Sequence, residues 1–339
     1  MKRFRMTALG RKGLAVICLL VAYLMSSTAS ANYLAREDVQ AFVTKASVKT
    51  GLSEAAVREI LAKGRYQQSI IDAISRPAEA QPWYKYRKIF LTDTRIRNGV
   101  RFWDENEEKL THIANDYGLP PEIIVAILGV ETAYGANMGS YRVLDALMTL
   151  GFDYPRRGAF FQQQLIALLE LAEKEGLDIE SVTGSYAGAM GMPQFIPTSY
   201  LAYAVDGNGD GRRDLWNNKE DVFASVANYL ARHGWEHEGE VAFQVEVGDA
   251  HVDDLLNTGR DLKPKTTLDE LAQRGVQLPE HSSVPGDIPV MLFTLTWPDR
   301  VEYWVGLNNF YVITRYNHSV LYAMAVYELA QAIRKARGS

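Results

Sequence analysis

The chain has 339 residues, of which 47% are hydrophobic and 23% are charged. This apolar content is sufficient for a hydrophobic core, and the charge content is too low for a chain that is disordered throughout. The formal net charge is −5, and it falls to near −10 (31 basic against 41 acidic groups) without the first 31 residues, which carry five basic and no acidic side chains. An acidic protein of this kind argues against nucleic acid as the partner.

Residues 1–31 have the composition of a secretory signal peptide. The basic residues Lys2, Arg3, Arg5, Arg11 and Lys12 precede an apolar run over residues 14–25, and the segment ends in Ala29, Ser30 and Ala31. This order predicts cleavage before Asn32 and export to the periplasm. The apolar run is shorter than the roughly 20 residues that a membrane-spanning helix needs.

Cys18 is the only cysteine of the chain, and it lies inside this apolar run. Val16 and Ile17 precede it, whereas a lipid-attachment motif places a small residue directly before the cysteine. We therefore expect a soluble exported protein without a lipid anchor. The mature chain would contain no cysteine, which excludes disulfides and thiolate metal ligands.

Residues 32–103 predict an N-terminal helical subdomain and a connector. A helical pattern runs over residues 37–75, in which Ser53 is placed to cap a helix over residues 54–63 and Gly64 is placed to end it. Residues 76–81 contain Pro77 among small residues and predict the connector.

Residues 104–235 alternate helical segments with glycine-rich loops and hold almost every residue suited to chemistry, so we predict the catalytic core here. Pro120 and Pro121 suit the first turn of a helix, and Glu122 complements its positive end. Gly135 suits the end of this helix. Glu131 is therefore expected in the last turns.

Glu131 continues an apolar helix stripe. Ile124, Ile127 and Glu131 fall at i, i+3 and i+7, so the carboxylate faces inward. Burial and the negative end of the helix dipole both disfavour the ionised form and raise its pKa, as a general acid near neutral pH requires. The alternative is a structural glutamate paired with an arginine.

Oxygen-bearing side chains recur at the ligand spacing of an EF-hand-like calcium loop. They are Asp206, Asn208, Asp210 and Asp214. Gly211 permits the sharp turn, and the Arg212 carbonyl would supply the seventh-position ligand. The ion would be structural, because no catalytic group lies in the loop. The alternative is a glycine-rich turn held by side-chain hydrogen bonds to the backbone.

Residues 236–310 predict a small β subdomain, because apolar residues alternate over 241–247 and 290–296. Residues 311–339 predict a C-terminal segment and helix, with Leu321, Met324, Ala325 and Leu329 at helical spacing.

Two other kinds of site are disfavoured. The serine of the GSYAG segment is one place out of register for a nucleophile elbow. His233 and His237 have i, i+4 spacing without an evident third ligand, so we expect a surface pair and no zinc site.

Six segments together resemble the lytic transglycosylase B family. They are GVETAYG at residues 129–135, DYPRR at 153–157, GSYAGAMGMPQF at 184–195, VDGNGDGRRDLW at 205–216, SVANYLARHGW at 225–235 and RYNHS at 315–319. One such motif is weak, whereas six in order over most of the mature chain are specific. The resemblance implies an α+β, mainly α fold, with a lysozyme-like catalytic core, a helical subdomain and a small β subdomain.

The resemblance also implies residue roles, with Glu131 as the sole catalytic acid and base. The implied glycan-binding residues are Arg156, Arg157, Ser185, Gln194, Tyr229, Tyr316, Asn317 and Tyr322. Hydroxyl and amide groups suit sugars, and guanidinium groups suit the carboxylates of peptidoglycan. The twelfth position of the calcium loop is Asn217 and not glutamate; because the related loops are longer, Asp221 or Glu220 would be the closing ligand.

The implied activity is that of a peptidoglycan lytic transglycosylase, which cleaves the MurNAc-β-1,4-GlcNAc bond. Hydrolases of the retaining and inverting types use two carboxylates, and no second acid stands in a comparably suggestive context. Glu131 would protonate the leaving oxygen and then, as base, activate the C6 hydroxyl of the same muramyl residue, giving a 1,6-anhydromuramyl end. The substrate's N-acetyl carbonyl would stabilise the developing positive charge.

Two alternatives stay open at this point, a lysozyme-like muramidase that uses water and a non-catalytic peptidoglycan-binding protein. In each case the partner is the glycan strand of peptidoglycan, and no organic cofactor is expected.

Overall fold

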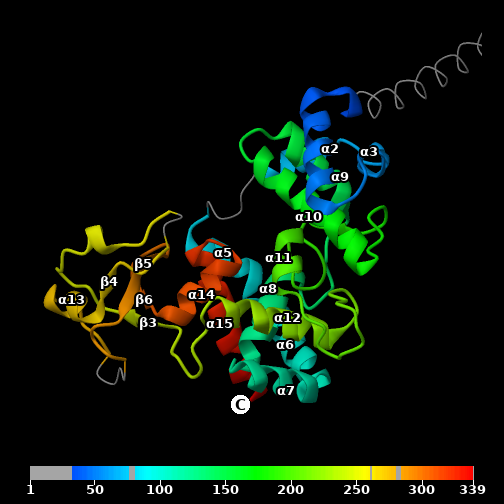
Figure 1. The fold of residues 1–339 in the computed structure, drawn as a ribbon. Helices are drawn as coiled ribbons and strands as arrows, with labels where there is room; N and C mark the ends of the chain where they lie inside the picture. The colour runs from blue at the N-terminus through cyan, green and yellow to red at the C-terminus, as the bar shows by residue number, and fades with distance from the viewer. Residues whose placement is uncertain (1–32, 76–80, 260–261, 280–283, 339) are drawn as a thin grey trace, which may run out of the picture. The chain divides into compact units, whose positions relative to one another are not determined.

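The computed structural model describes residues 33–75, 81–259, 262–279 and 284–338, so the predicted signal peptide and most of the predicted connector lie outside the described residues. Two compact units are seen (Figure 1). The first contains the described residues up to Ser75 and Ser140–Ala189, and the second contains those of Arg76–Gly139 and Met190–Ser339. Ser140–Ala189 thus groups with the N-terminal helices. The division into a helical subdomain, a catalytic core and a β subdomain stays a prediction.

The first unit is helical. It contains α2 (Glu37–Thr50), α3 (Glu54–Ala62), α4 (Gln68–Ile74), α9 (Val143–Asp153) and α10 (Gly158–Glu175), and the two-residue strands β1 (Tyr141–Arg142) and β2 (Thr183–Gly184) pair antiparallel. Ser53 caps α3 as predicted, because its Oγ accepts a hydrogen bond from the N–H of Ala56 at 3.1 Å.

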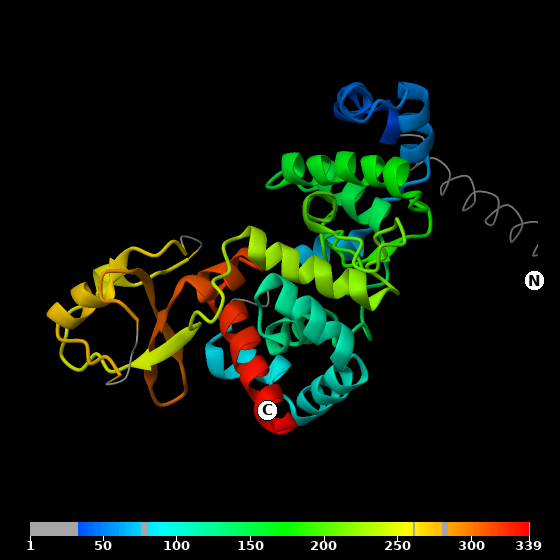
Figure 2. The ribbon, with the colours of Figure 1, turned by 60° about the horizontal axis from the view of Figure 1, so that its bottom comes forward.

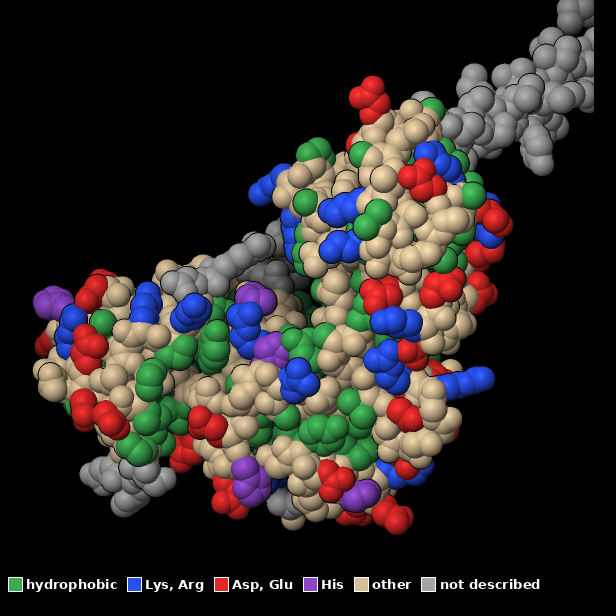
Figure 3. All heavy atoms as spheres, viewed as in Figure 1, with side chains coloured by type: hydrophobic (Ala, Val, Ile, Leu, Met, Phe, Trp, Pro, Cys, Tyr) green, Lys and Arg blue, Asp and Glu red, His purple; other side chains and the backbone are tan. Residues whose placement is uncertain are grey.

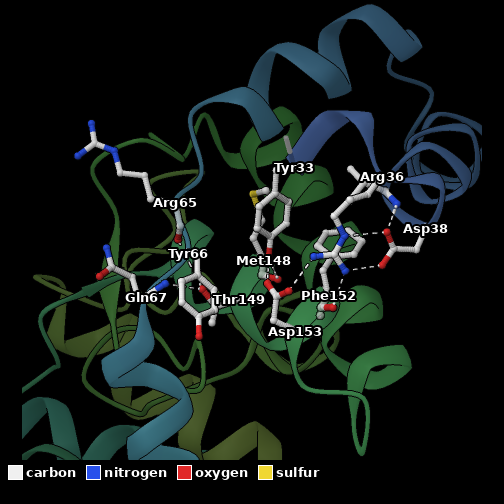
Figure 4. A network of polar contacts seen from close by, with 12 residues as sticks. Tyr33, Arg36, Asp38, Arg65, Tyr66, Gln67, Met148, Thr149, Phe152 and Asp153 are labelled. Carbon is white, nitrogen blue, oxygen red and sulfur yellow. Dashed lines mark hydrogen bonds and ion pairs between the residues drawn. The ribbon is translucent and has the colours of Figure 1, made fainter. Parts of the chain in front are cut away.

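The first described residues of the chain hold the end of α9 (Figure 4). The Tyr33 hydroxyl lies 3.1 Å from the carbonyl oxygen of Met148 and contacts the Asp153 carboxylate. The Arg36 guanidinium pairs with Asp153 at 2.7 Å and donates to the carbonyl oxygen of Phe152 at 2.7 Å. A cation at this position stabilises the negative end of the helix dipole and offsets the unfavourable charge of Asp153.

The second unit is built around a buried helix, α8 (Pro121–Thr132). The other helices of this unit are α5 (Trp83–Phe90), α6 (Asp93–Glu105), α7 (Glu107–Tyr117), α11 (Pro197–Tyr203), α12 (Lys219–Arg232), α14 (Asn308–Tyr316) and α15 (Val320–Arg337). Helices α15, α6, α7 and α12 all contact α8 (Figure 2). Ten of its twelve residues are buried, so the helix is enclosed on nearly all sides.

A four-stranded antiparallel sheet completes the second unit. Its strands follow the order β3 (Ala242–Val245), β6 (Val301–Gly306), β5 (Pro289–Thr296) and β4 (Thr266–Thr267), and the short helix α13 (Leu268–Gln273) follows β4. On one face, Leu292 and Val305 join a buried apolar cluster. On the other, the ring of Phe293 stacks on Phe310 of α14 at 4.7 Å. The central part of β5 is therefore buried on both faces.

Helices dominate the described chain, and the small sheet lies where alternation predicts it. Among the described residues, no single helix is long and apolar enough to cross a membrane, and α7 and α8 meet that test only as a pair bent by 110°. On the face drawn in Figure 3, acidic and basic side chains both reach the surface of each unit.

Candidate active site

Glu131 is the last residue but one of α8, as predicted, and it belongs to the second unit. Apart from Pro121 it is the only residue of this helix that is partly rather than fully buried, so its side chain is shielded from most solvent and still reaches the surface. The prediction that Gly135 ends the helix is wrong by two residues, about half a turn. Ala133 takes the left-handed cap conformation with φ 50°, and its N–H bonds the carbonyl oxygen of Gly129 at 3.2 Å.

The carboxylate of Glu131 accepts a hydrogen bond from the Tyr322 hydroxyl at 2.6 Å. Burial raises the pKa of Glu131 to about 7, although the hydrogen bond from Tyr322 acts in the opposite direction. A carboxyl group with this pKa is partly protonated near neutral pH. It can give a proton to a leaving oxygen and, once ionised, take one back.

The side chains of three tyrosines lie in contact with one another beside this carboxylate. Tyr316 stacks on Tyr322 with ring centroids 6.4 Å apart, and Tyr229 lies 4.8 Å from Tyr316. The Tyr316 hydroxyl donates to the carbonyl oxygen of Pro193, and that of Tyr229 donates to the carbonyl oxygen of Arg315, each at 2.6 Å. Burial and the charge of Glu131 raise the pKa of Tyr316 and Tyr322, which keeps both phenols neutral.

A tight turn over residues 191–195 is tied to the end of α8. The Thr132 hydroxyl donates to the carbonyl oxygen of Met192 at 2.9 Å. Gln194 has φ 52°, and its side-chain amide donates to the carbonyl oxygens of Gly191 at 2.9 Å and Met138 at 3.2 Å. Strained backbone of this kind is often found where function fixes a side chain. These bonds turn the Gln194 amide inward onto its own loop.

The remaining residues of the predicted glycan site lie partly in the first unit. Arg156 and Arg157 are exposed, and the guanidinium of Arg157 lies 4.3 Å from the ring centroid of Phe160. Ser185 is partly buried, and its Oγ accepts a hydrogen bond from the N–H of Ala189 at 3.1 Å. The structure brings Glu131 together with the predicted tyrosines in the second unit. Arg156, Arg157 and Ser185 belong to the first unit and are described only within it.

Some neighbours of the site were not predicted. Asn317, a predicted site residue, follows α14 and is partly buried. Phe195 lies 5.9 Å from the Tyr316 ring; it was not singled out, although it ends one of the six motifs. His233 was expected at the surface, which is wrong. It is partly buried, and its ring stacks on Tyr229 at 4.2 Å. Only the packing of α12 reveals these contacts.

The predicted calcium loop is folded around its own backbone amides. The Asp206 carboxylate accepts hydrogen bonds from the N–H groups of Gly209, Asp210 and Gly211. Among the described residues, no three His, Cys, Asp or Glu side chains converge closely enough to hold a metal ion in this arrangement. The donor types are carboxylate, amide and carbonyl oxygens, which are the ligands that calcium prefers.

The two candidates for the closing ligand of the loop differ in position, and only Asp221 contacts the loop backbone. Asp221 is fully buried, and its two oxygens accept hydrogen bonds from the N–H groups of Gly207 at 2.8 Å and Asp214 at 2.7 Å, at opposite ends of the loop. Burial raises its pKa, and the negative charges of nearby loop aspartates raise it further. Glu220 instead pairs with Lys109 at 2.8 Å. A cation would balance the gathered negative charge, so the loop fits calcium chemically.

A carboxyl group with a pKa near neutrality, on a buried helix and beside tyrosine hydroxyls, is typical of enzymes that cleave glycosidic bonds. Comparison with known proteins matches the chain to one specific family. The family model described as "Transglycosylase SLT domain" matches residues 34–331. The membrane-bound lytic murein transglycosylase B of Escherichia coli (strain K12) is 40% identical over 310 residues, which cover 88% of this chain and 83% of that protein.

Solved structures agree with this match. A soluble lytic transglycosylase from Pseudomonas aeruginosa is 46% identical, with a TM-score of 0.82 over 88% of this chain and 98% of that one. A lytic transglycosylase of Escherichia coli, solved in complex with calcium, is 40% identical, with a TM-score of 0.78 over 88% and 93% of the two chains. This chain belongs to the transglycosylase SLT family. The resemblance drawn from the six motifs and the mainly α, lysozyme-like fold are both confirmed.

Proposed function

We propose that this protein is a peptidoglycan lytic transglycosylase with Glu131 as its single acid and base. The observation that carries the proposal is the carboxyl group at the end of α8, whose pKa burial raises to about 7 and whose oxygen is held by Tyr322 at 2.6 Å. Of the described residues, no other carboxylate perturbs this pKa. The family relatives named as murein transglycosylases support the same activity.

The reaction consists of two proton transfers, one from Glu131 and one to it. Protonated Glu131 donates to the glycosidic oxygen between MurNAc and GlcNAc, and the bond to the muramyl anomeric carbon breaks as the N-acetyl carbonyl stabilises the positive charge. The Glu131 carboxylate then takes the proton of the C6 hydroxyl, whose oxygen attacks the same anomeric carbon. The products are a 1,6-anhydromuramyl end and a free GlcNAc hydroxyl, and Glu131 is protonated again.

The tyrosines beside Glu131 are suited to hold the sugar. Neutral phenols both donate to and accept from sugar hydroxyls, and their rings pack on the apolar faces of the sugar. We assign glycan binding to Tyr229, Tyr316 and Tyr322, together with Asn317 and Gln194. In the first unit, Ser185, Arg156 and Arg157 are assigned the same role, and the exposed arginines suit the carboxylates of the peptide stems.

The deciding experiment is a digest of purified sacculi with the wild type and Glu131→Gln. Mass spectrometry of the products should show anhydromuropeptides with the wild type and none with the variant. Glu122→Gln is the matched control, because it makes the same change on the same helix at a buried residue that pairs with Arg334. Products heavier by one water would identify a hydrolase, and unchanged cleavage by Glu131→Gln would refute the assignment of the acid.

We also propose that calcium binds the loop through oxygens of Asp206, Asn208, Asp210, the Arg212 carbonyl, Asp214 and Asp221, as a structural ion. The support is the oxygen donor set, the position of Asp221 between the two loop ends, and the calcium complex of the Escherichia coli relative. When bound, calcium would neutralise the clustered carboxylates; it takes no part in the proton transfers of Glu131.

The chain is further proposed to be exported and soluble in the periplasm after cleavage before Asn32. The sequence of residues 1–31 is the support, and these residues lie outside the described part of the chain. One relative is named membrane-bound and another soluble, so cell fractionation is the test. Recovery of the mature protein in the membrane fraction, with Cys18 retained and lipid-modified, would refute it.

A further inference from the structure

The backbone directly after Glu131 is strained in an unusual way. Ala133 and Tyr134 are consecutive non-glycine residues in the left-handed region, with φ of 50° and 64°. L-residues rarely adopt this conformation, and glycine normally occupies it at the end of a helix. Such a turn persists only where surrounding contacts determine it.

The side chain of Tyr134 supplies these contacts. Its hydroxyl donates to the carbonyl oxygen of Arg95 in α6 at 2.9 Å, and its ring lies 5.4 Å from that of Phe102 in the same helix. A Cβ atom added at Gly99 of α6 would lie 2.6 Å from the Tyr134 hydroxyl, and one added at Gly129 of α8 would lie 2.7 Å from it. The ring therefore fits between the two helices only because both positions are glycine.

Arg95 contacts α8 as well. Its guanidinium donates to the carbonyl oxygen of Gly129, two residues before Glu131, and lies 5.6 Å from the ring centroid of Phe90. Arg95 is partly buried, and within the described part of the chain no carboxylate affects its pKa. Burial lowers its pKa, which reflects the cost of keeping an unpaired cation there. A cation at the end of α8 also stabilises the negative end of that helix.

We propose that Arg95 and Tyr134 are positioning residues that fix the last turn of α8, and through it the direction of the Glu131 carboxylate. The proposal rests on the proposed function of Glu131. Arg95 makes a hydrogen bond on each side of Glu131 in the sequence. Its carbonyl oxygen accepts from the Tyr134 hydroxyl after the helix, and its guanidinium donates to the carbonyl oxygen of Gly129 before Glu131. Rotation of the last turn would displace the carboxylate from the reacting oxygens, and a small displacement of a catalytic group lowers the rate strongly.

The test compares Tyr134→Phe, Arg95→Met and Arg95→Lys with the wild type, using the rate of anhydromuropeptide release. Tyr134→Phe and Arg95→Met should lower kcat by about ten- to a hundredfold with KM changed less than threefold. Arg95→Lys, which keeps a cation able to donate to Gly129, should recover part of the loss.

Tyr327→Phe is the matched control, since the Tyr327 hydroxyl also donates to a carbonyl oxygen in the same unit, that of Ala242 at 3.1 Å. It should lower thermal stability as much as Tyr134→Phe while keeping kcat within twofold. Equal kcat values for the two variants, or a loss that follows the loss of stability in both, would overturn the positioning role. If the wild type releases no anhydromuropeptides, the proposed function itself fails, which is a different outcome.

Discussion

Tyr322→Phe should move the pH dependence of the reaction to higher pH. The Tyr322 hydroxyl donates to Glu131 at 2.6 Å and lowers the pKa of Glu131, against the larger effect of burial. A hydrogen bond to a charged group contributes about 1.5–3 kcal/mol, and each pKa unit corresponds to about 1.4 kcal/mol. Without the hydroxyl, the pKa of Glu131 should therefore rise from about 7 by roughly one to two units.

The assay is kcat/KM for anhydromuropeptide release measured against pH. Because the free enzyme must carry a protonated Glu131, its activity falls as pH rises through this pKa. The falling limb should lie near pH 7 for the wild type and one to two units higher for Tyr322→Phe. Tyr316→Phe is the control, because the Tyr316 hydroxyl donates to Pro193 and not to Glu131. A limb that stays in place, or moves to lower pH, in Tyr322→Phe would refute the reasoning.

Three further predictions concern stability. The pKa of Glu131 is raised from 4.5 to about 7 in the folded state, so its contribution to stability is present below pH 4.5 and is lost as pH rises to about 7. Relative to Glu131→Gln, the free energy of unfolding of the wild type should fall by up to about 3 kcal/mol over this window, and by less because solvent screens the partly exposed side chain. Urea unfolding at several pH values measures this loss. Calcium should raise the melting temperature of the wild type but not of Asp221→Asn, and an equal rise in both would exclude Asp221 as a ligand. Gly191→Ala should lower the melting temperature much more than Gly176→Ala, since both glycines have positive φ but only at Gly191 would the added Cβ meet backbone, the carbonyl oxygen of Leu215 at 2.7 Å.

The main helix of the site was predictable from local signals. Pro121 at its first turn and the run of apolar residues before Glu131 specify where α8 begins and that it is buried. The stripe of Ile124 and Ile127 understated that burial, because periodicity shows one apolar face and four neighbouring helices enclose the others. The end of α8 could not be predicted, since the cap at Ala133 depends on contacts made by a distant helix.

The sheet shows a similar division. Alternation at residues 290–296 predicts β5, which the structure confirms as Pro289–Thr296. Its central partner β6, Val301–Gly306, was not singled out, although it pairs with both β3 and β5. Tyr303 and Val305 lie on the face that joins the apolar cluster, but Trp304 lies on the other face, so residues 303–305 form an unbroken apolar run. A short apolar run without alternation gives a weak periodic signal.

The acidity of Glu131 depends on residues far away in the sequence. Tyr322 occupies the first turn of α15, and its own N–H bonds the capping hydroxyl of Ser319 at 3.3 Å. The cap fixes where α15 begins, and the start of α15 determines which side chain of its first turn faces α8. The motif at residues 315–319 therefore bears on the chemistry through helix geometry: it sets the position of the hydroxyl that opposes the burial of Glu131 and holds its pKa near neutrality.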